Sequence, residues 1–295
     1  NFRTGWKQAV KFGEMIEGDL LDEAALKAAF AQVKPDAVMH FAALSNVGES
    51  VANPELYWRN NVGGSLNLLC AMRDAGVGSI VFSSTAATYG EPDQDPITET
   101  APQRPINAYG ASKLAVEALL DDFEKAHGIR SIAFRYFNVA GADPDRQIGE
   151  HHVPETHLIP NVLDAAAGAR EALTVNGDDY PTPDGTCIRD YVHVMDLVDA
   201  HVLGTEWLLA GKPSQRLNLG TGSGFSIWQV IDAAKEVVGT EIPLSVGPRR
   251  PGDPSRLVCD GARAREVLGW EPKRSVMAEM IGDAWGWRQT GRYSA

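Results

Sequence analysis

The first half of the chain alternates short runs that are apolar throughout with longer stretches in which apolar residues recur at helical spacing. The apolar runs lie at 37–42, 79–85 and 130–137, and the helical stretches at 55–75 and 108–126. Continuously apolar runs are typical of strands that are buried on both faces of a parallel sheet. The alternation therefore predicts an α/β fold, in which a doubly wound parallel sheet carries helices on both faces.

The second half of the chain contains more loop-forming residues than the first. Loops rich in proline, glycine and aspartate occur at 142–146, 178–185 and 247–253. Two further strands, beginning near Tyr191 and Arg216, each lead into a helix. We predict a first domain in residues 1–139 and a smaller mixed α/β domain in residues 140–295, with some segments of the second returning to the main sheet.

Composition narrows the class of protein. The chain has 295 residues, of which 44% are hydrophobic and 22% charged, as expected of a globular protein. A net charge of -12 disfavours binding to nucleic acid or to an anionic membrane surface. The sequence has no apolar run long enough to span a bilayer and no secretory signal, so we expect a cytoplasmic enzyme. Its three widely spaced cysteines suggest structural thiols.

A tyrosine and a lysine four residues apart give the first chemical indication. Tyr109 and Lys113 share one face of the helix predicted at 108–126, and Thr85 ends the strand before it. A phenol has an ordinary pKa of about 10, and a neighbouring ammonium favours its phenolate form. Tyr109 could then take a proton from a sugar hydroxyl while a nicotinamide accepts hydride from the carbon beneath. The alternative is a surface tyrosine and a solvated lysine at ordinary helical spacing.

A dinucleotide-binding fold normally opens with a strand, a glycine-rich turn and a helix, and none is recognisable before the strand at 37–42. We expect about thirty residues of such an opening to lie outside this sequence. The later segment Gly220–Gly224 also follows a strand, but Phe225 stands in place of the third glycine. We interpret that segment as an ordinary turn.

Further motifs accompany these residues along nearly the whole chain. One set comprises Glu17-Gly-Asp19, His40-Phe-Ala-Ala43, Asn60-Asn-Val62, Ser83-Ser-Thr85, Tyr109-Gly-Ala-Ser-Lys113 and Arg135-Tyr-Phe-Asn138. A narrower set comprises Asn176-Gly-Asp-Asp-Tyr-Pro-Thr182, Arg189-Asp-Tyr191, His193-Val-Met-Asp196 and Arg249-Arg250. Together they resemble the extended short-chain dehydrogenase/reductase family, and the narrower set resembles its UDP-glucose 4-epimerase branch. The resemblance implies a Rossmann-like fold, a tightly held NAD, and inversion of C4 of a UDP-hexose through a transient 4-keto intermediate.

The same resemblance implies roles for single residues. Tyr109 is the base at the 4-hydroxyl, Thr85 hydrogen-bonds that oxygen, and Lys113 holds the nicotinamide ribose while lowering the pKa of the tyrosine. The other residues implied at the cofactor are Asp19, Leu20, Phe41, Ala42, Ala43, Asn61, Ser83 and Tyr136. Those implied at the nucleotide sugar, besides Thr85, are Asn138, Leu158, Arg189, Tyr191, Arg250, Asp253 and Leu257.

Several of these assignments have plainer alternatives. Phe41 and Tyr136 could be core aromatics at strand ends, and Asn61 could be a helix-surface amide. Arg189 and Arg250 could form salt bridges with nearby acids, although a guanidinium fork also matches phosphate oxygens.

The resemblance also concerns partners and metals. It implies a homodimer that pairs the helices at 55–75 and 108–126 in a four-helix bundle. It implies no metal, because the loop Glu155–Pro160 matches a family loop that needs none, in spite of His151, His152 and His157.

The identity of the sugar stays open. Leu257 stands where some family members have a tyrosine that limits the 2-substituent, so UDP-GlcNAc or UDP-GalNAc is one alternative and UDP-xylose or UDP-arabinose another. A 4,6-dehydratase is disfavoured because no Asp-Glu pair follows Thr85. The remaining alternative is a non-catalytic relative that only binds nucleotide sugars, against which stand the intact Thr85, Tyr109 and Lys113.

Overall fold

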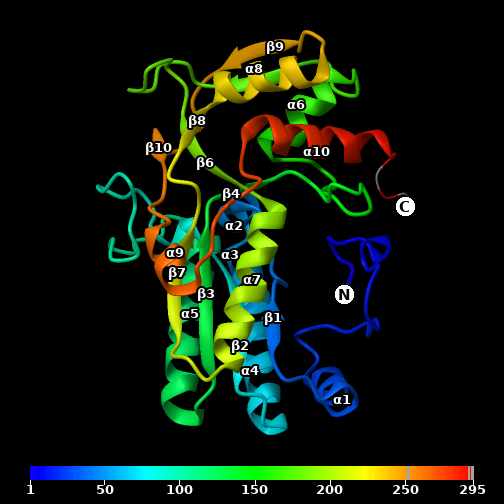
Figure 1. The fold of residues 1–295 in the computed structure, drawn as a ribbon, viewed down its shortest axis with the longest axis vertical. Coiled ribbons are helices and arrows are strands. Elements are labelled where there is room, and N and C mark those ends of the chain that lie inside the picture. The colour runs from blue at the N-terminus through cyan, green and yellow to red at the C-terminus, as the bar shows by residue number, and fades with distance from the viewer. Residues whose placement is uncertain (251–252, 292, 294–295) are drawn as a thin grey trace.

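Four parallel strands form the main sheet of this computed structural model, which describes residues 1–250, 253–291 and 293 (Figure 1). Their order is β1-β2-β3-β7, with bounds β1 Val38–His40, β2 Ser79–Thr85, β3 Arg130–Tyr136 and β7 Gln215–Leu219. Thr85 is paired in register with Tyr136, and Tyr136 with Leu219. The carboxyl ends of these strands therefore meet at one edge, where ligands bind in parallel α/β sheets.

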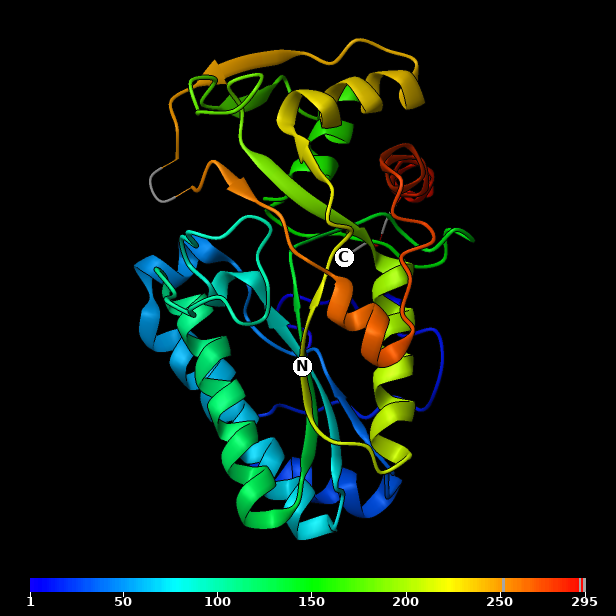
Figure 2. The same ribbon diagram turned by 60° about the vertical axis from the view of Figure 1, so that its left-hand side comes forward.

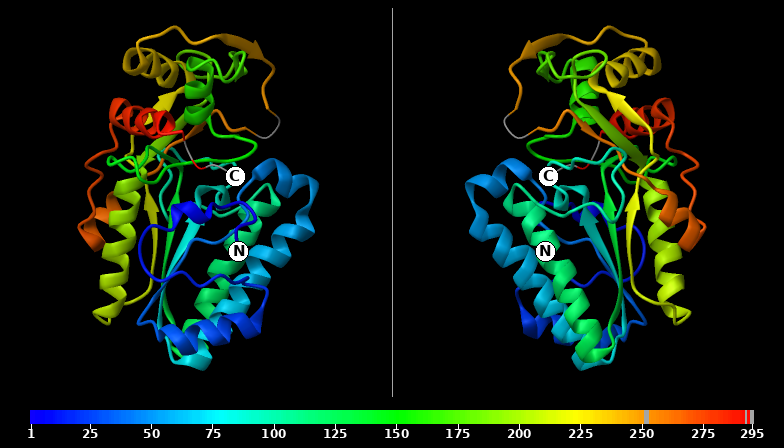
Figure 3. Two further views of the ribbon diagram at one scale, coloured as in Figure 1. Left: turned by 90° about the vertical axis from the view of Figure 1, so that its right-hand side faces the viewer. Right: turned by 90° about the vertical axis from the view of Figure 1, so that its left-hand side faces the viewer.

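Helices cover both faces of this sheet, which confirms the predicted α/β class (Figure 3). One face packs against α1 (Glu23–Val33), α4 (Gly64–Ala75) and α5 (Ala108–His127), and the other against α7 (Val194–Leu209) and α9 (Ala262–Leu268). The strands show the required alternation: Ile80 and Phe82 point to the first face, and Val81 to the second. All three side chains are almost fully buried, as the continuous apolar pattern predicted.

The helical stretch predicted at 55–75 is interrupted. After α2 (Val47–Ala52), it consists of α3 (Pro54–Tyr57), a π-helical segment at Trp58–Gly63, and α4. Within the π-helical segment Asn61 is buried, and its amide accepts a hydrogen bond from Leu44 N (2.8 Å) and donates to Leu44 O (3.0 Å). Asn61 is therefore not a surface amide.

A second lobe lies above the carboxyl edge of the main sheet (Figure 1). Its strands are β4 (Asn138–Ala140), β5 (Leu173–Asn176), β6 (Ile188–His193), β8 (Gly224–Ser226), β9 (Leu244–Gly247) and β10 (Arg256–Leu257). The order β10-β6-β4 is parallel, β8 runs antiparallel to β6, and β5 pairs with β9. Its helices α6 (Leu158–Ala166), α8 (Ile227–Val238) and α10 (Met277–Gln289) share one apolar core.

The chain does not pass once from the first lobe to the second. After β6, helix α7 returns to the main sheet and β7 adds its fourth strand beside β3 (Figure 2). Segments after residue 140 therefore contribute to the main sheet, whereas a division at 139/140 stays a prediction.

The glycine-rich segment after β7 is a turn whose backbone amides are hydrogen-bonded within the protein. The buried carboxylate of Asp190 accepts hydrogen bonds from Thr221 N (2.9 Å) and Gly222 N (3.0 Å). A Cβ at Gly220 would lie 2.4 Å from Cys259 Sγ, so close packing accounts for this glycine. These two amides are occupied by Asp190, which agrees with an ordinary turn.

The cysteines and the helices give two further observations. Cys70, Cys187 and Cys259 are all free thiols, and the last two are buried. Over the part of the chain that the structure describes, none of the helices combines the length and the apolar character needed to cross a membrane.

Candidate active site

Thr85 and Tyr109 meet at the carboxyl end of β2. Thr85 is the last residue of that strand, and Tyr109 lies in the first turn of α5. Their side chains lie close enough for the Thr85 hydroxyl to lower the pKa of the Tyr109 phenol; Thr85 is mostly buried, and Tyr109 is partly exposed. The structure thus brings the strand-end hydroxyl and the helical tyrosine to the same strand end, while their catalytic roles stay a prediction.

Gly110 makes this approach possible. A Cβ at Gly110 would lie 2.4 Å from Ala87 O, in the 3-10 turn Ala86–Thr88 that directly follows Thr85. The first turn of α5 therefore rests against that turn, with no room for a side chain between them. Asn107 caps the helix here, since its Oδ1 accepts from Gly110 N at 2.8 Å.

Lys113 is also in the site, but it is directed to the sheet. Its Nζ donates a hydrogen bond to Ser83 O at 2.7 Å and lies 4.8 Å from the centre of the Phe82 ring. The side chain is only 2% exposed, and burial lowers the pKa of its ammonium to about 7. Lys113 and Tyr109 do share one helix face, as their spacing predicted.

The acidity of Tyr109 differs from the expectation. Burial raises the pKa of its phenol, and the contribution that lowers this pKa comes from the Thr85 hydrogen bond. Lys113, whose ammonium is turned to the Ser83 carbonyl, is not among the groups that lower this pKa, so its expected effect on the tyrosine stays a prediction.

The residues around the ammonium fit the nicotinamide half of NAD. An ammonium has three donors, and among the described residues Lys113 Nζ makes one hydrogen bond. Two donors are therefore left for ribose hydroxyls. Beside it, the end of β1 presents a half-exposed Phe41 ring (50%) followed by Ala42 and Ala43, which are small and accessible. Such strand ends leave room for a flat ring and suit a dinucleotide.

The other predicted cofactor residues have specific positions. Ser83 is buried and its hydroxyl contacts that of Tyr136, which is partly exposed at the end of β3. Asp19 Oδ1 accepts from Leu21 N at 2.9 Å, and this bond is the main reason that the carboxyl pKa is lowered. Leu20 packs between α1 and α4. Neither Phe41 nor Tyr136 is fully buried, so the alternative of purely core aromatics fits them poorly.

Four of the eight residues predicted at the sugar nucleotide lie on one small sheet. Asn138 of β4 is paired in register with Tyr191 of β6, and Arg189 of β6 with Leu257 of β10. Arg189 Nη2 donates to Asp253 Oδ1 at 2.8 Å, which is the salt bridge considered as its alternative. Tyr191 is buried in the core of the second lobe and packs edge-on against Phe225, a position better suited to packing than to direct ligand contact.

Two of the predicted nucleotide residues lie apart from this sheet. Arg250 is exposed, and with the Asn176 amide in the orientation that satisfies both of its ends, Asn176 Oδ1 accepts from Arg250 Nη2 at 3.2 Å. Leu158 begins α6 and packs against the core of the second lobe.

A buried ion pair supports the site, and the sequence analysis missed it. Arg135 Nε and Nη2 donate to the two carboxylate oxygens of Glu117 at 3.0 and 2.5 Å, and Ser84 Oγ donates to Glu117 Oε1 at 2.5 Å. These contacts join β2, β3 and α5 directly behind Thr85. The available signal was a charged residue within each apolar pattern, Arg135 in a strand and Glu117 in a helix stripe.

Comparisons with known proteins agree with this geometry. The family model described as GDP-mannose 4,6 dehydratase matches residues 3–283. A UDP-glucose 4-epimerase of Lacticaseibacillus casei is 50% identical over 290 residues, covering 98% of this chain and 88% of that protein. The crystal structure of UDP-glucose 4-epimerase from Brucella ovis in complex with NAD is similar with a TM-score of 0.95 at 48% identity, covering 97% of this chain and 88% of that one. The enzyme from Bifidobacterium longum in complex with NAD+ and UDP has a TM-score of 0.93 at 37% identity, covering 98% and 89%.

Proposed function

Because this chain belongs to the family of UDP-glucose 4-epimerases, we propose that it interconverts UDP-galactose and UDP-glucose by inverting C4 of the hexose, with NAD as cofactor. The observation that carries the proposal is the neighbouring pair Thr85–Tyr109 at the end of β2, with Lys113 on the same face of α5 as Tyr109. The family model that matches the chain is named after a dehydratase. The sequence after Thr85 is Ala-Ala-Thr, however, without the acidic residues that a dehydratase needs to eliminate water.

Tyr109 is the proton acceptor in this proposal. It takes the proton from the 4-hydroxyl of the sugar and gives it back after the 4-keto sugar has turned over in the site. Thr85 holds the reacting oxygen through the hydroxyl that already bonds Tyr109, and Lys113 uses its two remaining donors on the nicotinamide ribose. NAD, held at its nicotinamide ribose by Lys113, would supply the hydride acceptor for C4.

The nucleotide half is assigned to the second lobe. Arg189 and Arg250 bind the phosphates, and Asp253 binds the ribose. The Arg189–Asp253 pair supports this assignment, because it places a guanidinium and a carboxylate together beside β10. Guanidinium groups bind phosphate oxygens in a bidentate manner, and they supply local positive charge in a chain of net charge -12.

The test is a direct assay. Purified protein is incubated with UDP-galactose and NAD, and UDP-glucose is followed by proton NMR of the anomeric signals. Conversion toward equilibrium, abolished in Tyr109→Phe, is the expected result. Binding of UDP-galactose without any conversion would favour the alternative of a non-catalytic binding protein.

Leu257 favours a second substrate class. Its side chain is partly exposed on β10 and packs beside Tyr89 and Ile97. A leucine is smaller than the tyrosine of some family members, so an N-acetyl group at C2 of the sugar has more room. Leu257→Tyr is expected to lower the ratio of UDP-GlcNAc to UDP-galactose kcat/KM by about ten-fold or more. Unchanged ratios would exclude this role.

We also propose that two chains pair through α4 and α5. These helices lie against each other on one face of the sheet, and the outward residues Trp58 and Leu66 are 44% and 40% exposed. Light scattering of the native protein is expected to give the mass of a dimer, and Leu66→Asp to shift it toward the monomer. A monomeric native protein would contradict the pairing.

A cytoplasmic location is the corresponding proposal for the cell. Three free thiols suit a reducing compartment, although they do not identify one. Cell fractionation with an antibody to the protein tests it.

A further inference from the structure

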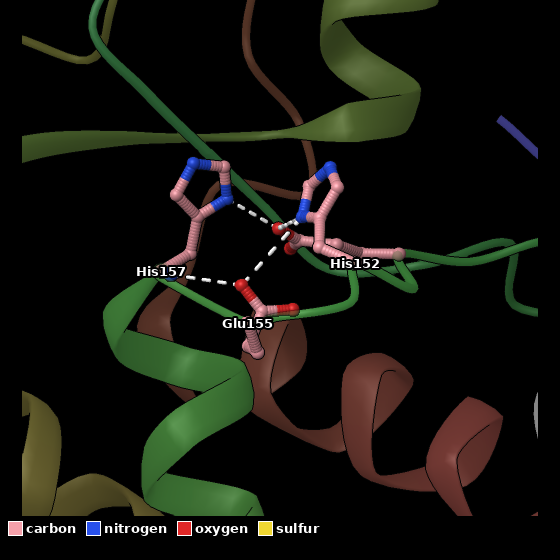
Figure 4. A group of neighbouring side chains, drawn as sticks. His152, Glu155 and His157 are labelled. Atoms are coloured by element: carbon pink, nitrogen blue, oxygen red, sulfur yellow. Dashed lines mark hydrogen bonds and ion pairs between the residues drawn. The ribbon is translucent and has the colours of Figure 1, made fainter. Parts of the chain in front are cut away.

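The loop that leads into α6 gathers four side chains able to bind a metal ion. Glu150, His152, Glu155 and His157 each offer one ligand atom, and these atoms all lie within 4.8 Å of one another. Figure 4 shows the rings of His152 and His157 on either side of the Glu155 carboxylate. The four residues lie within one eight-residue segment, outside the Thr85–Tyr109 site.

The spacing of these atoms is close to that of a tetrahedral site. His152 Nδ1 lies 3.1 Å from Glu150 Oε1 and 3.6 Å from Glu155 Oε1, and His157 Nδ1 also contacts Glu150 Oε1. Four ligands at zinc distances of about 2.0–2.2 Å lie about 3.4 Å from one another. These two distances lie on either side of that value, and all the ligand atoms lie within 4.8 Å of one another, so side-chain shifts of about an ångström would enclose an ion.

A buried carboxylate oxygen gives independent support. The Glu155 side chain is only 7% exposed. Its Oε1 accepts from the amides of Thr156 (2.7 Å) and His157 (2.8 Å), whereas its Oε2 is buried and has no hydrogen-bond partner among the described residues. A buried carboxylate oxygen without a partner is costly, and a rotation of the Glu155 carboxylate that turns Oε2 toward the cluster would let a cation satisfy it.

The charges of the four side chains also fit a divalent cation. With both imidazoles neutral, the four side chains carry two negative charges. One divalent cation balances them, and neutral imidazole and carboxylate are both ordinary zinc ligands. Without an ion, the same atoms form the His–Glu ion pairs described above.

The surroundings hold the loop in place from two other segments. Trp287 Nε1 of α10 donates to Glu150 O at 3.1 Å. Trp6 Nε1 donates to His151 O at 2.8 Å, and the Trp6 and His151 rings stack at 4.6 Å. His157 is the N-cap residue of α6, whose first residue is Leu158. An ion at this position would therefore fix the start of α6 relative to α10.

We propose that Glu150, His152, Glu155 and His157 form a closed, structural zinc site. Four protein ligands leave no open coordination position, so the ion orders the loop and the start of α6 and takes no part in the chemistry at Tyr109. The inference is independent of the proposed epimerase activity, since it concerns a different set of residues. It also differs from the sequence expectation of no metal, which rested on the likeness of the 155–160 loop to that of the family.

The first test is metal content and affinity of the whole protein. After exhaustive dialysis against metal-free buffer, the native protein is expected to keep one zinc per chain. The double variant His152→Ala/Glu155→Gln is expected to bind zinc at least about 100-fold more weakly, since losing even an outer-shell partner costs 10–100-fold. The exposed His127, on α5, gives the control His127→Ala, which should retain the ion. Zinc lost on dialysis of the native protein, or retained equally by the double variant, overturns the proposal.

A second test, in which a new absorption band is expected, applies if the double variant folds poorly. Metal-free protein is loaded with Co2+, and the visible bands of four-coordinate cobalt are expected in the native protein. His152→Cys should add a thiolate-to-cobalt charge-transfer band, whereas His127→Cys should not. A six-coordinate cobalt spectrum, or no new band in His152→Cys, excludes this ligand set.

Discussion

Lys113 donates its hydrogen bond to the backbone carbonyl of Ser83 and not to the Tyr109 hydroxyl, although the two side chains share one face of α5. The ammonium is thereby fixed to β2, two residues before Thr85. Its role is to present donors and charge at a set position beside the strand ends.

Replacing Lys113 by methionine removes those donors while filling a similar volume. We expect kcat/KM to fall by about 100-fold and bound NAD to be lost on gel filtration. Lys113→Arg should not restore either property, because the side chain is 2% exposed and the planar guanidinium does not fit the same space. Full activity in Lys113→Met would contradict the assigned role.

Thr85 should control the pH at which Tyr109 works. The Thr85 hydrogen bond is what lowers the pKa of the phenol, so Thr85→Val is expected to raise it. A base acts in its deprotonated form, hence activity rises with pH through this pKa, and the rising limb of the kcat/KM profile should move to higher pH in Thr85→Val. Thr85→Ser keeps the hydroxyl and should keep the limb in place. If the kcat/KM profiles of Thr85→Val and Thr85→Ser coincided, the role of the hydrogen bond would be contradicted.

Gly110→Ala tests the close approach that places Tyr109. The added Cβ would lie 2.4 Å from Ala87 O, so α5 must move away from the Ala86–Thr88 turn. A displacement of about 1 Å can cost about 100-fold in rate, and we expect a loss of that size together with a lower Tm. Gly78→Ala is the matched control, because a Cβ there meets nothing within 4 Å. Equal kinetics of the two variants would show that the contact is not needed.

The ion pair Glu117–Arg135 should matter more for stability than exposed pairs. Its side chains are 4% and 5% exposed, so Glu117→Ala leaves a buried, unpaired guanidinium and should lower the free energy of unfolding by about 3–5 kcal/mol. Replacing both residues, as Glu117→Leu/Arg135→Met, should recover part of that loss. On the same helix, Asp121 pairs with Arg216 but is 55% exposed, and Asp121→Ala should cost about 0–1 kcal/mol in urea unfolding.

His40 should make stability depend on pH. Burial, with a smaller contribution from the charge of Lys113, lowers its pKa from 6.5 to about 3, while the unfolded chain keeps the ordinary value. Between the two pKa values, the His40 side chain binds a proton in the unfolded state but not in the folded state. Its contribution to stability is therefore fully present above pH 6.5 and is lost as the pH falls toward 3. Between about pH 7 and pH 5 this contribution amounts to about 2 kcal/mol.

The comparison that isolates His40 is its replacement by glutamine, which can still bond Ser65 but does not titrate. Urea unfolding of both proteins at the two pH values should show a smaller loss in His40→Gln. An equal pH dependence of the two proteins would contradict the lowered pKa.

The sequence predicted those parts of the fold that depend on local pattern. Strand β2 and helix α5 lie within a residue or two of their predicted ends, because apolar runs and helical spacing report burial directly. The positions of Tyr109 and Lys113 on one helix face follow from the same periodicity. The π-helical segment at Trp58–Gly63 was not predicted, and the contact that Asn61 makes there with the Leu44 backbone joins positions that a local pattern does not relate.

Contacts between distant residues account for most of what sequence could not supply. Arg189 and Asp253 are 64 positions apart, and their pairing depends on where β10 lies against β6. The direction of the Lys113 ammonium depends on a backbone carbonyl, which no side-chain pattern reveals. The histidines and glutamates of the segment 150–157 can be seen in the sequence, but only the folded loop brings their four ligand atoms together.

The return of β7 to the main sheet has a consequence for how the molecule can be divided. A fragment ending at residue 139 would lack β7 and α7, leaving β3 as an edge strand that pairs only with β2, with Ile132 and Phe134 uncovered. Bare edges and exposed apolar faces favour aggregation. The strand that completes the sheet is thus made late in the chain, so the amino-terminal half cannot finish folding during synthesis until residues far downstream have emerged.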